Sequence, residues 1–273
     1  HIKDWIFSNR NRSLRLQTHN RDIDNTVLPT NIANQLLLIE KDLCNNIKAI
    51  KFTPPVAYMY NPLEYADDVH ANYVRKYCIS EKKILFLGMN PGPWGMSQTG
   101  VPFGEVKTVQ DWLQLSGEIK KPHREHPDRQ VTGFNCKRSE ISGNRFWKLF
   151  KRLCHHPEKF FQYAYLRNYC PIALMRDTGR NITPGIQRQN KKILEDECDH
   201  ALVQIIQLLN VEVVIGIGRY AEEKAKSAIR NAGLNVAVCY MKHPSPQATG
   251  NQNWDEEAER TLNELGLIEY FKY

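Results

Sequence analysis

The sequence predicts an α/β fold in which a parallel sheet of four strands is flanked by helices. Four short apolar runs alternate along the chain with segments of helical periodicity, which is the pattern of crossover connections between parallel strands. The first run, 84–87, is apolar at every position, as is typical of a strand buried on both faces. Polar residues follow three of the four runs, at the edge where such sheets bind ligands.

The residues before the first strand are expected to form a tail and two helices. Residues 1–29 are polar and rich in arginine and asparagine, which predicts a flexible tail. Apolar residues at helical spacing predict a helix over 31–47. A second helix is expected over 63–77, after a cap and first-turn proline at Asn61-Pro62. The first residue is His1 rather than Met, as expected of a fragment or a trimmed chain.

The rest of the chain continues the alternation. Further strands are expected within 164–171, 211–217 and 235–241, and helices over 107–115, 142–154, 191–209, 220–232 and 254–265. Residues 116–140 are polar and charged and read as a long irregular excursion. Because neither an internal repeat nor a linker is evident, residues 30–273 are interpreted as a single domain.

Composition narrows the class of protein. The chain has 273 residues, 41% of them hydrophobic and 25% charged, and a net charge of +7, which favours an acidic partner such as nucleic acid or reflects solubility alone. No apolar run is long enough to span a membrane, and no signal peptide is visible. The 7 cysteines are odd in number and form no C-x-x-C pair. This argues against a disulfide framework and against a zinc or iron–sulfur site. We therefore expect reduced thiols in an intracellular protein.

The loop after the first strand is the strongest candidate for a binding site. Within 88–104 it combines glycines, which let a ligand approach the backbone, with prolines, which stiffen it, and with the flat side chains of Trp94 and Phe103. A purely structural turn would need fewer of these residues. We therefore interpret the loop as a ligand-binding loop.

Three polar residues stand at the ends of predicted strands: Asn90, Asn168 and His243. Each alone has a structural explanation, as a turn former, a strand end or a surface histidine. Because the carboxyl ends of parallel strands share one edge, we expect them to meet in one pocket. Two amides and an imidazole can read hydrogen-bonding edges and orient water.

A nucleotide-binding α/β protein is an alternative. Residues 216–221 match the relaxed G-x-G-x-x-A fingerprint between a strand and a helix. They follow the third strand, however, and no acidic residue ends the next strand, so we interpret them as a close-packed turn. Ser245 lies near His243 but lacks the nucleophile elbow of serine hydrolases.

Several motifs resemble the single-strand-selective monofunctional uracil-DNA glycosylases. Residues 88–106, GMNPGPWGMSQTGVPFGEV, are similar to the first motif of that family, and His243-Pro-Ser-Pro246 is similar to its second. Similar family sequence occurs at 138–147, 168–171 and 262–267. Trp94 and Gln247 depart from the family, where phenylalanine and, in many members, arginine are expected.

The resemblance runs from about Pro54 to the C-terminus, and it implies that the domain over residues 30–273 has a three-layer uracil-DNA glycosylase fold. We expect the protein to work as a monomer in the nucleus without metal or cofactor. It implies base-excision repair, in which uracil and 5-hydroxymethyluracil are flipped out of single- or double-stranded DNA and the N-glycosidic bond is hydrolysed, leaving an abasic site. The alternative within this fold is a non-catalytic DNA-binding module.

The resemblance also implies a role for each matching residue. Asn90 positions the attacking water and His243 stabilises the departing uracil anion. Phe103 stacks on the base, Asn168 reads its polar edge, and Met89, Gly92 and Met96 shape the pocket near C5. The DNA-binding residues it implies are Ser245, Pro246 and Gln247. Gln247 is expected to fill the space that the flipped base vacates less well than the arginine of many family members. The basic residues between Lys120 and Arg138 are either phosphate contacts or a solvated loop.

Overall fold

The structure is a computed structural model of the 273-residue chain. It describes residues 31–184 and 190–273. The expected flexible tail over residues 1–29 therefore lies outside the described residues.

The centre of the fold is a four-stranded parallel sheet in the order β3-β2-β6-β7. Its strands are β2 (Ile84–Gly88), β3 (Ala164–Asn168), β6 (Val213–Ile217) and β7 (Ala237–Met241). All four predicted strands are confirmed, and the last two begin two residues later than expected. β2 is buried at every position, because strands pack on both of its edges and helices on both of its faces.

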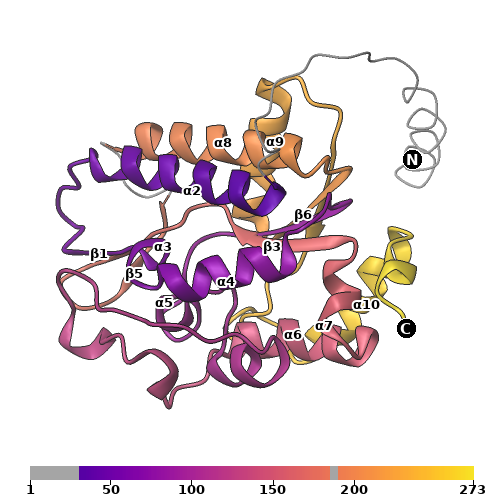
Figure 1. Ribbon diagram of the computed structural model, residues 1–273, viewed down its shortest axis with the longest axis horizontal. Coiled ribbons are helices and arrows are strands. Elements are labelled where there is room, and N and C mark those ends of the chain that lie inside the picture. Colours follow the sequence, from indigo (N-terminus) through magenta and orange to yellow (C-terminus); the bar gives the residue numbers. More distant parts are fainter. Residues whose placement is uncertain (1–30, 185–189) are drawn as a thin grey trace.

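Helices cover both faces of the sheet and complete a three-layer α/β sandwich (Figure 1). One layer is formed by α2 (Ile32–Lys48), α8 (Lys191–Leu208) and α9 (Arg219–Asn231), which pack on one another. The opposite layer is formed by α6 (Ile141–Cys154), α7 (Pro157–Phe161) and α10 (Trp254–Glu264). The predicted helices of these two layers occur with ends shifted by a residue or two, and the short α7 was not predicted.

The helix expected over 63–77 is in fact two helices. α3 (Pro62–Tyr65) and α4 (Asp67–Tyr77) are separated by Ala66, whose φ of −113° and ψ of 32° are not helical. Ala66 is fully buried, and a Cβ added to Gly100 would lie only 2.8 Å from the carbonyl oxygen of Ala66. Close packing of the ligand-binding loop on this break outweighs the continuous helical periodicity of the segment.

Two further elements differ from expectation. The helix expected over 107–115 is a short π-helical turn, Thr108–Trp112. A small antiparallel sheet, in the order β1-β4-β5, was not predicted. It consists of β1 (Tyr58–Tyr60), β4 (Ala173–Met175) and β5 (Asn181–Ile182). Strands of two or three residues give too short an alternation to be recognised from sequence.

Aromatic side chains fill the core between β2 and the α6–α10 layer. Phe86 of β2 stacks on Phe160 at a centroid distance of 5.6 Å and meets Phe146 and Phe150 edge-on. All four side chains are fully buried. Burying a phenylalanine contributes about 1.5–3 kcal/mol, so this cluster anchors the strand from which the ligand-binding loop departs.

A buried ion pair joins α2 and α4 to the same loop. His70 Nε2 lies 2.6 Å from Glu40 Oε2, and His70 Nδ1 donates to the carbonyl oxygen of Gly100 at 2.9 Å. Burial alone would raise the pKa of Glu40 and lower that of His70, but their mutual attraction outweighs it and shifts both pKa values the opposite way. The pair is therefore charged, and it holds Gly100 in its left-handed conformation.

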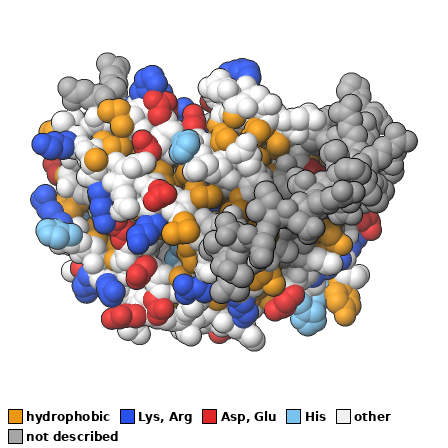
Figure 2. All heavy atoms as spheres, turned by 45° about the horizontal axis from the view of Figure 1, so that its top comes forward, with side chains coloured by type: hydrophobic (Ala, Val, Ile, Leu, Met, Phe, Trp, Pro, Cys, Tyr) orange, Lys and Arg blue, Asp and Glu red, His pale blue; other side chains and the backbone are white. Residues whose placement is uncertain are grey.

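The surface carries mixed charge on the face that Figure 2 shows, where basic and acidic side chains are interspersed. Among the described residues, no helix is long and apolar enough to cross a membrane. All seven cysteines are free thiols; six are buried and Cys136 is half-buried.

Candidate functional site

The three polar residues predicted to meet at the sheet edge do line one cavity. Gly88 pairs with Asn168 across β2 and β3, and Asn90 follows β2 by two residues, as His243 follows β7. The cavity has a volume of about 620 Å³, and Asn90, Asn168 and His243 are all in its wall. The parallel register therefore assembles the site from three segments far apart in the sequence.

The other predicted site residues lie at the same cavity, with one exception. Its wall also contains Met89, Gly92, Phe103, Ser245, Pro246 and Gln247. Met96, at the start of α5 (Met96–Thr99), is buried and does not line the cavity. It lies behind Asn168, whose Nδ2 donates to the Met96 sulfur at 3.2 Å.

Asn168, in the wall of the cavity, has a buried side-chain oxygen, Oδ1, without a hydrogen-bond partner among the described residues. The whole residue is buried. Its Nδ2 donates to a thioether, which is a weak acceptor. A buried polar group left in this state costs about 1–3 kcal/mol. This amide is therefore prepared for a ligand that offers one donor and one acceptor side by side.

Phe103 is fixed in a strained conformation beside this amide. Its φ of 51° lies in the left-handed region, which phenylalanine rarely adopts. The indole N–H of Trp147 donates to the Phe103 carbonyl oxygen at 3.1 Å, and a Cβ added to Gly143 would lie 2.3 Å from that oxygen. α6 thus fixes the Phe103 backbone, and the ring forms a flat wall 6.0 Å from the His243 ring.

His243 is held as a neutral imidazole. The backbone N–H of Ser245 donates to His243 Nδ1 at 3.1 Å, which assigns the proton of the neutral ring to Nε2. Burial lowers the pKa of His243 below its ordinary value. The residue therefore offers an N–H donor at neutral pH.

The loop that carries His243 is fixed by residues that sequence reasoning missed. Asn251 Nδ2 donates to the carbonyl oxygens of His243 and Ser245 at 2.9 and 2.5 Å. Arg145 Nη1 donates to the carbonyl oxygen of Pro244 at 3.3 Å. Arg145 lies in the family-like segment 138–147 but had no role assigned to it, and Asn251 lies outside the family-like segments; they support the loop from α6 and from the segment before α10.

Asn90 is oriented by the segment after β3. Its Nδ2 donates to the carbonyl oxygen of Ile172 at 3.2 Å. This contact fixes the side-chain amide and leaves Oδ1 to accept a hydrogen bond from a water molecule.

Glu140 is a buried carboxyl in the cavity wall that sequence reasoning missed. Within the described part of the chain its Oε2 has no hydrogen-bond partner, and it packs so tightly that a Cβ added to Gly92 would lie 2.7 Å from Oε1. Burial, and secondarily the charge of Glu105, raises the pKa of Glu140 to about 7. The two glycines at 92 and 95 are thus needed to accommodate this side chain.

We expect Glu140→Gln to flatten the pH dependence of stability. The folded-state pKa of about 7 exceeds the ordinary value of 4.5, so the folded protein binds the proton more tightly than the unfolded chain. The wild-type protein should therefore lose stability as the pH rises from 4.5 through 7, and the uncharged variant should lose less. Melting temperatures at pH 5 and pH 8 measure this. The exposed Glu223→Gln on α9 is the control, and an unchanged pH dependence in Glu140→Gln would contradict the prediction.

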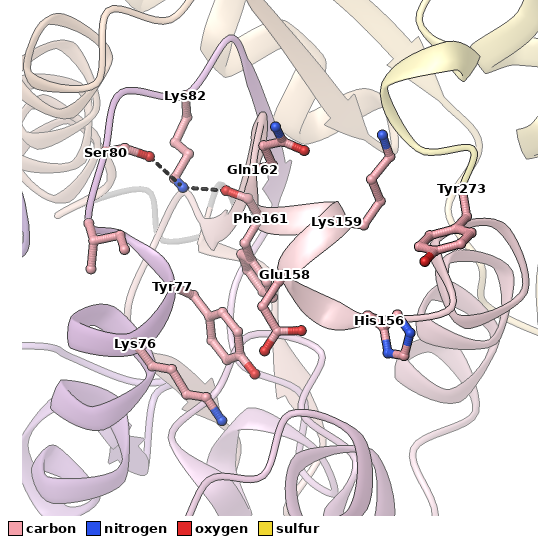
Figure 3. Close-up of a pocket in the computed structure, with 11 residues that line it drawn as sticks. Lys76, Tyr77, Ser80, Lys82, His156, Glu158, Lys159, Phe161, Gln162 and Tyr273 are labelled. Carbon is pink, nitrogen blue, oxygen red and sulfur yellow. Dashed lines mark hydrogen bonds between the residues drawn. The ribbon is translucent and has the colours of Figure 1, made fainter.

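A second large cavity lies at the opposite edge of the sheet (Figure 3). It has a volume of about 600 Å³ and is lined by residues that precede β2 and β3, including Lys82, Phe161 and Gln162. The Lys82 ammonium donates to the Phe161 carbonyl and to Ser80, and burial lowers the pKa of Lys82. None of the predicted site residues lies in this cavity. It is also at the amino ends of the strands, where α/β sheets seldom bind substrates.

The glycine-rich turn after β6 is a packing feature. A Cβ added to Gly216 would lie 2.5 Å from the backbone nitrogen of Glu222, and one added to Gly218 would lie 3.5 Å from His243 Cβ. The turn therefore brings α9 against β6 and supports His243, as the interpretation of a close-packed turn predicts.

Comparison with known proteins agrees with this arrangement. Residues 74–266 match the family described as the uracil DNA glycosylase superfamily. The chain is 45% identical over 242 residues to "Single-strand selective monofunctional uracil DNA glycosylase" of Bos taurus, covering 88% of this chain and 89% of that protein. It is 44% identical to the Rattus norvegicus protein of the same description, covering 87% and 86%.

A solved structure is similar as well. The crystal structure of wild-type Pedobacter heparinus SMUG2 superimposes with a TM-score of 0.58 and 17% sequence identity, covering 84% of this chain and 97% of that chain. At this identity the similarity concerns the fold, and it agrees with the three-layer sandwich described above.

Proposed function

Because the chain belongs to the uracil DNA glycosylase superfamily, we propose that it is a monofunctional uracil-DNA glycosylase that hydrolyses the N-glycosidic bond of uracil in DNA. The observation that carries the proposal is the unpartnered Oδ1 of buried Asn168 in the wall of a cavity that Asn90 and His243 also line. A base must leave the stack to reach such a cavity.

The Asn168 amide is complementary to the edge of uracil. Uracil presents an N3–H donor next to the O4 acceptor, which match the free Oδ1 and the weakly bound Nδ2 of Asn168. Cytosine presents the reverse order at these positions and would leave a buried polar group unpaired. A site that hydrogen-bonds its substrate rejects such an analogue strongly. The Phe103 ring supplies the apolar face on which the base stacks.

His243 and Asn90 carry the chemistry in this proposal. Breaking the bond leaves a cationic sugar and an anionic uracil. The Nε2–H of neutral His243 donates to the developing negative charge on the base, in a site whose burial strengthens the interaction. The Asn90 Oδ1 orients a water molecule, whose oxygen adds to C1′ of the sugar. The proton that this water loses passes through solvent to the uracil anion, so that the products are free uracil and an abasic site.

The cavity also supports the monofunctional assignment. The residues that line it, all within the described part of the chain, include no lysine whose amine could form a Schiff base with the sugar. Hydrolysis by water is therefore the reaction that these residues support.

We extend the proposal to 5-hydroxymethyluracil and to both single- and double-stranded DNA. The resemblance places C5 of the base near Gly92, beside which the Glu140 carboxyl offers a polar group to a C5 hydroxymethyl substituent. The cavity of about 620 Å³ has room for a substituted pyrimidine. Excision of 5-hydroxymethyluracil from matched single- and double-stranded oligonucleotides tests this extension.

The proposed activity is tested with an oligonucleotide that contains a single uracil, in the presence of a chelator. We expect strand scission only after alkali, which cleaves at abasic sites. Scission before alkali would indicate a lyase, and no scission after alkali would contradict the proposed function.

Gly88→Ala is expected to lower uracil excision about 10- to 100-fold, because small displacements of positioning groups are costly. The added Cβ would lie 2.4 Å from Asn168 Oδ1 and 2.6 Å from Phe103 Cε2, so both proposed base-binding side chains must move. Single-turnover rates measure the effect. Gly233→Asn is the control for a glycine replacement, because an added Cβ meets nothing within 4 Å there and asparagine tolerates the φ of 64° at this position. An equal rate in both variants would count against these base contacts.

A further inference from the structure

A further hollow, distinct from the cavity of Figure 3, adjoins the cavity that Asn90, Asn168 and His243 line, which we call the substrate cavity. It has a volume of about 550 Å³ and shares Trp94 and Arg138 with the cavity. Its remaining wall comes from the excursion between Pro127 and Lys137. A polymer whose one unit occupied the cavity would therefore find an open path for the next units in this hollow.

The hollow is lined by cations that lack acidic partners. Arg129, Lys137 and Arg138 are in its wall, against the single carboxylate of Asp128. Among residues 31–184 and 190–273, none of the three cations forms an ion pair within 4.0 Å. Arg219 and Lys226 differ in this respect, because both form ion pairs with Glu222. The free charge here is suited to an anionic ligand.

The two arginines are arranged around Trp94. The guanidinium carbon of Arg138 lies 4.0 Å from the centre of the indole ring, and that of Arg129 lies 5.5 Å from it. A guanidinium that stacks on an aromatic ring keeps the N–H groups at its edge available for oxygen ligands. The stacking thus orients two cations without neutralising them.

The basic segment is fixed to the ligand-binding loop. Gln98 of α5 is fully buried, and its Nε2 donates to the carbonyl oxygens of Pro93 and Gln130 at 3.1 and 3.0 Å. Its Oε1 accepts from the backbone N–H of Thr132 at 2.8 Å. One side chain therefore fixes the backbone next to Arg129 relative to the ligand-binding loop, so a ligand bound there would require little ordering of this segment.

We propose that this hollow binds backbone phosphates of the DNA strand that carries the target nucleotide, immediately beside the flipped base. The inference rests on the proposed function and adds a subsite to it. Arg138 and Arg129 bind the phosphate oxygens through guanidinium N–H groups, although Arg129 Nη1 also donates to the Asp128 carbonyl oxygen at 2.9 Å. Lys137 adds charge at the rim. Such contacts are independent of sequence and fix where the strand enters the cavity.

The test is the salt dependence of binding to a single-stranded oligonucleotide that contains uracil. The double variant Arg129→Gln/Arg138→Gln should bind more weakly, and the slope of log Kd against log salt should fall by about 0.7 for each phosphate that the variant no longer neutralises. The control Arg75→Gln/Arg230→Gln removes the same two charges from exposed positions on α4 and α9 outside both hollows, and it should leave affinity and slope unchanged. An unchanged slope in the double variant would overturn the proposal.

Truncated substrates locate the bound phosphates. Oligonucleotides that end next to the uridine, on one side or the other, remove the flanking phosphates of that side. For one of the two truncations, the wild-type protein should lose affinity while the double variant loses little. If the double variant loses as much as wild type for both truncations, the phosphates bind elsewhere. Binding is measured independently of excision, so absence of excision by the wild-type protein would contradict the proposed function without deciding this subsite.

Discussion

Replacing His243 with leucine is expected to lower the single-turnover rate of uracil excision about 10²- to 10³-fold, the usual effect of removing one donor that stabilises a developing anion. The imidazole donates from Nε2 because Nδ1 accepts the Ser245 N–H, and leucine fills similar space without a donor. The exposed His200→Leu on α8 is the matched control. A variant that retains most of the wild-type rate would exclude His243 from the chemistry.

His243 also makes the folded protein less stable at acidic pH. Because burial lowers the pKa of His243, the folded state binds its proton less tightly than the unfolded chain. The corresponding stability is fully present above the ordinary pKa of 6.5 and is lost as the pH falls from there through the lowered pKa. His243→Leu should therefore remove one component of acid destabilisation while it removes activity.

Asn90→Ala is expected to lower excision about 10²-fold while it preserves DNA binding. The amide is held by the Ile172 carbonyl and orients water rather than the base, so its loss disturbs the approach of the nucleophile alone. Excision is followed by alkaline cleavage, and binding by fluorescence anisotropy with the same oligonucleotide. Asn231→Ala, at the exposed end of α9, controls for loss of an asparagine.

This experiment also separates the enzyme from a non-catalytic binding module of the same fold. In an enzyme, excision falls in Asn90→Ala and binding persists. In a binding module, neither the wild-type protein nor the variant would excise uracil, and both would bind DNA alike.

The sheet and the three residues at its edge were predictable because strong local signals define them. A continuous apolar run predicts β2. The alternation of strands with helices predicts a parallel sheet, and a parallel sheet places Asn90, Asn168 and His243 at one edge without any knowledge of side-chain packing. The glycine and proline loop after β2 was recognisable for a similar reason. Glycine and proline restrict or widen the backbone conformations of this loop directly, and both are frequent within residues 88–104.

The parts that could not be predicted depend on contacts between distant segments. Glu140 lies in the polar excursion and in the family-like segment 138–147, but neither pattern shows that its carboxyl packs against Gly92. Arg145 and Asn251 act on backbone carbonyls, which leave no pattern in the sequence. The position of Met96 behind Asn168 likewise follows from the packing of α5 and not from the motif that contains it.

The Glu40–His70 pair has a consequence for how this chain tolerates change. Positions 40 and 70 lie on helices that contribute nothing to the cavity wall, yet His70 holds the Gly100 carbonyl of the loop that does. Replacing one partner alone leaves an unmatched charge in the interior, whereas replacing both with apolar residues removes that penalty. The two positions should therefore vary together among functional sequences, and an engineered substrate loop would tolerate a new residue at either position only if its counterpart were exchanged as well.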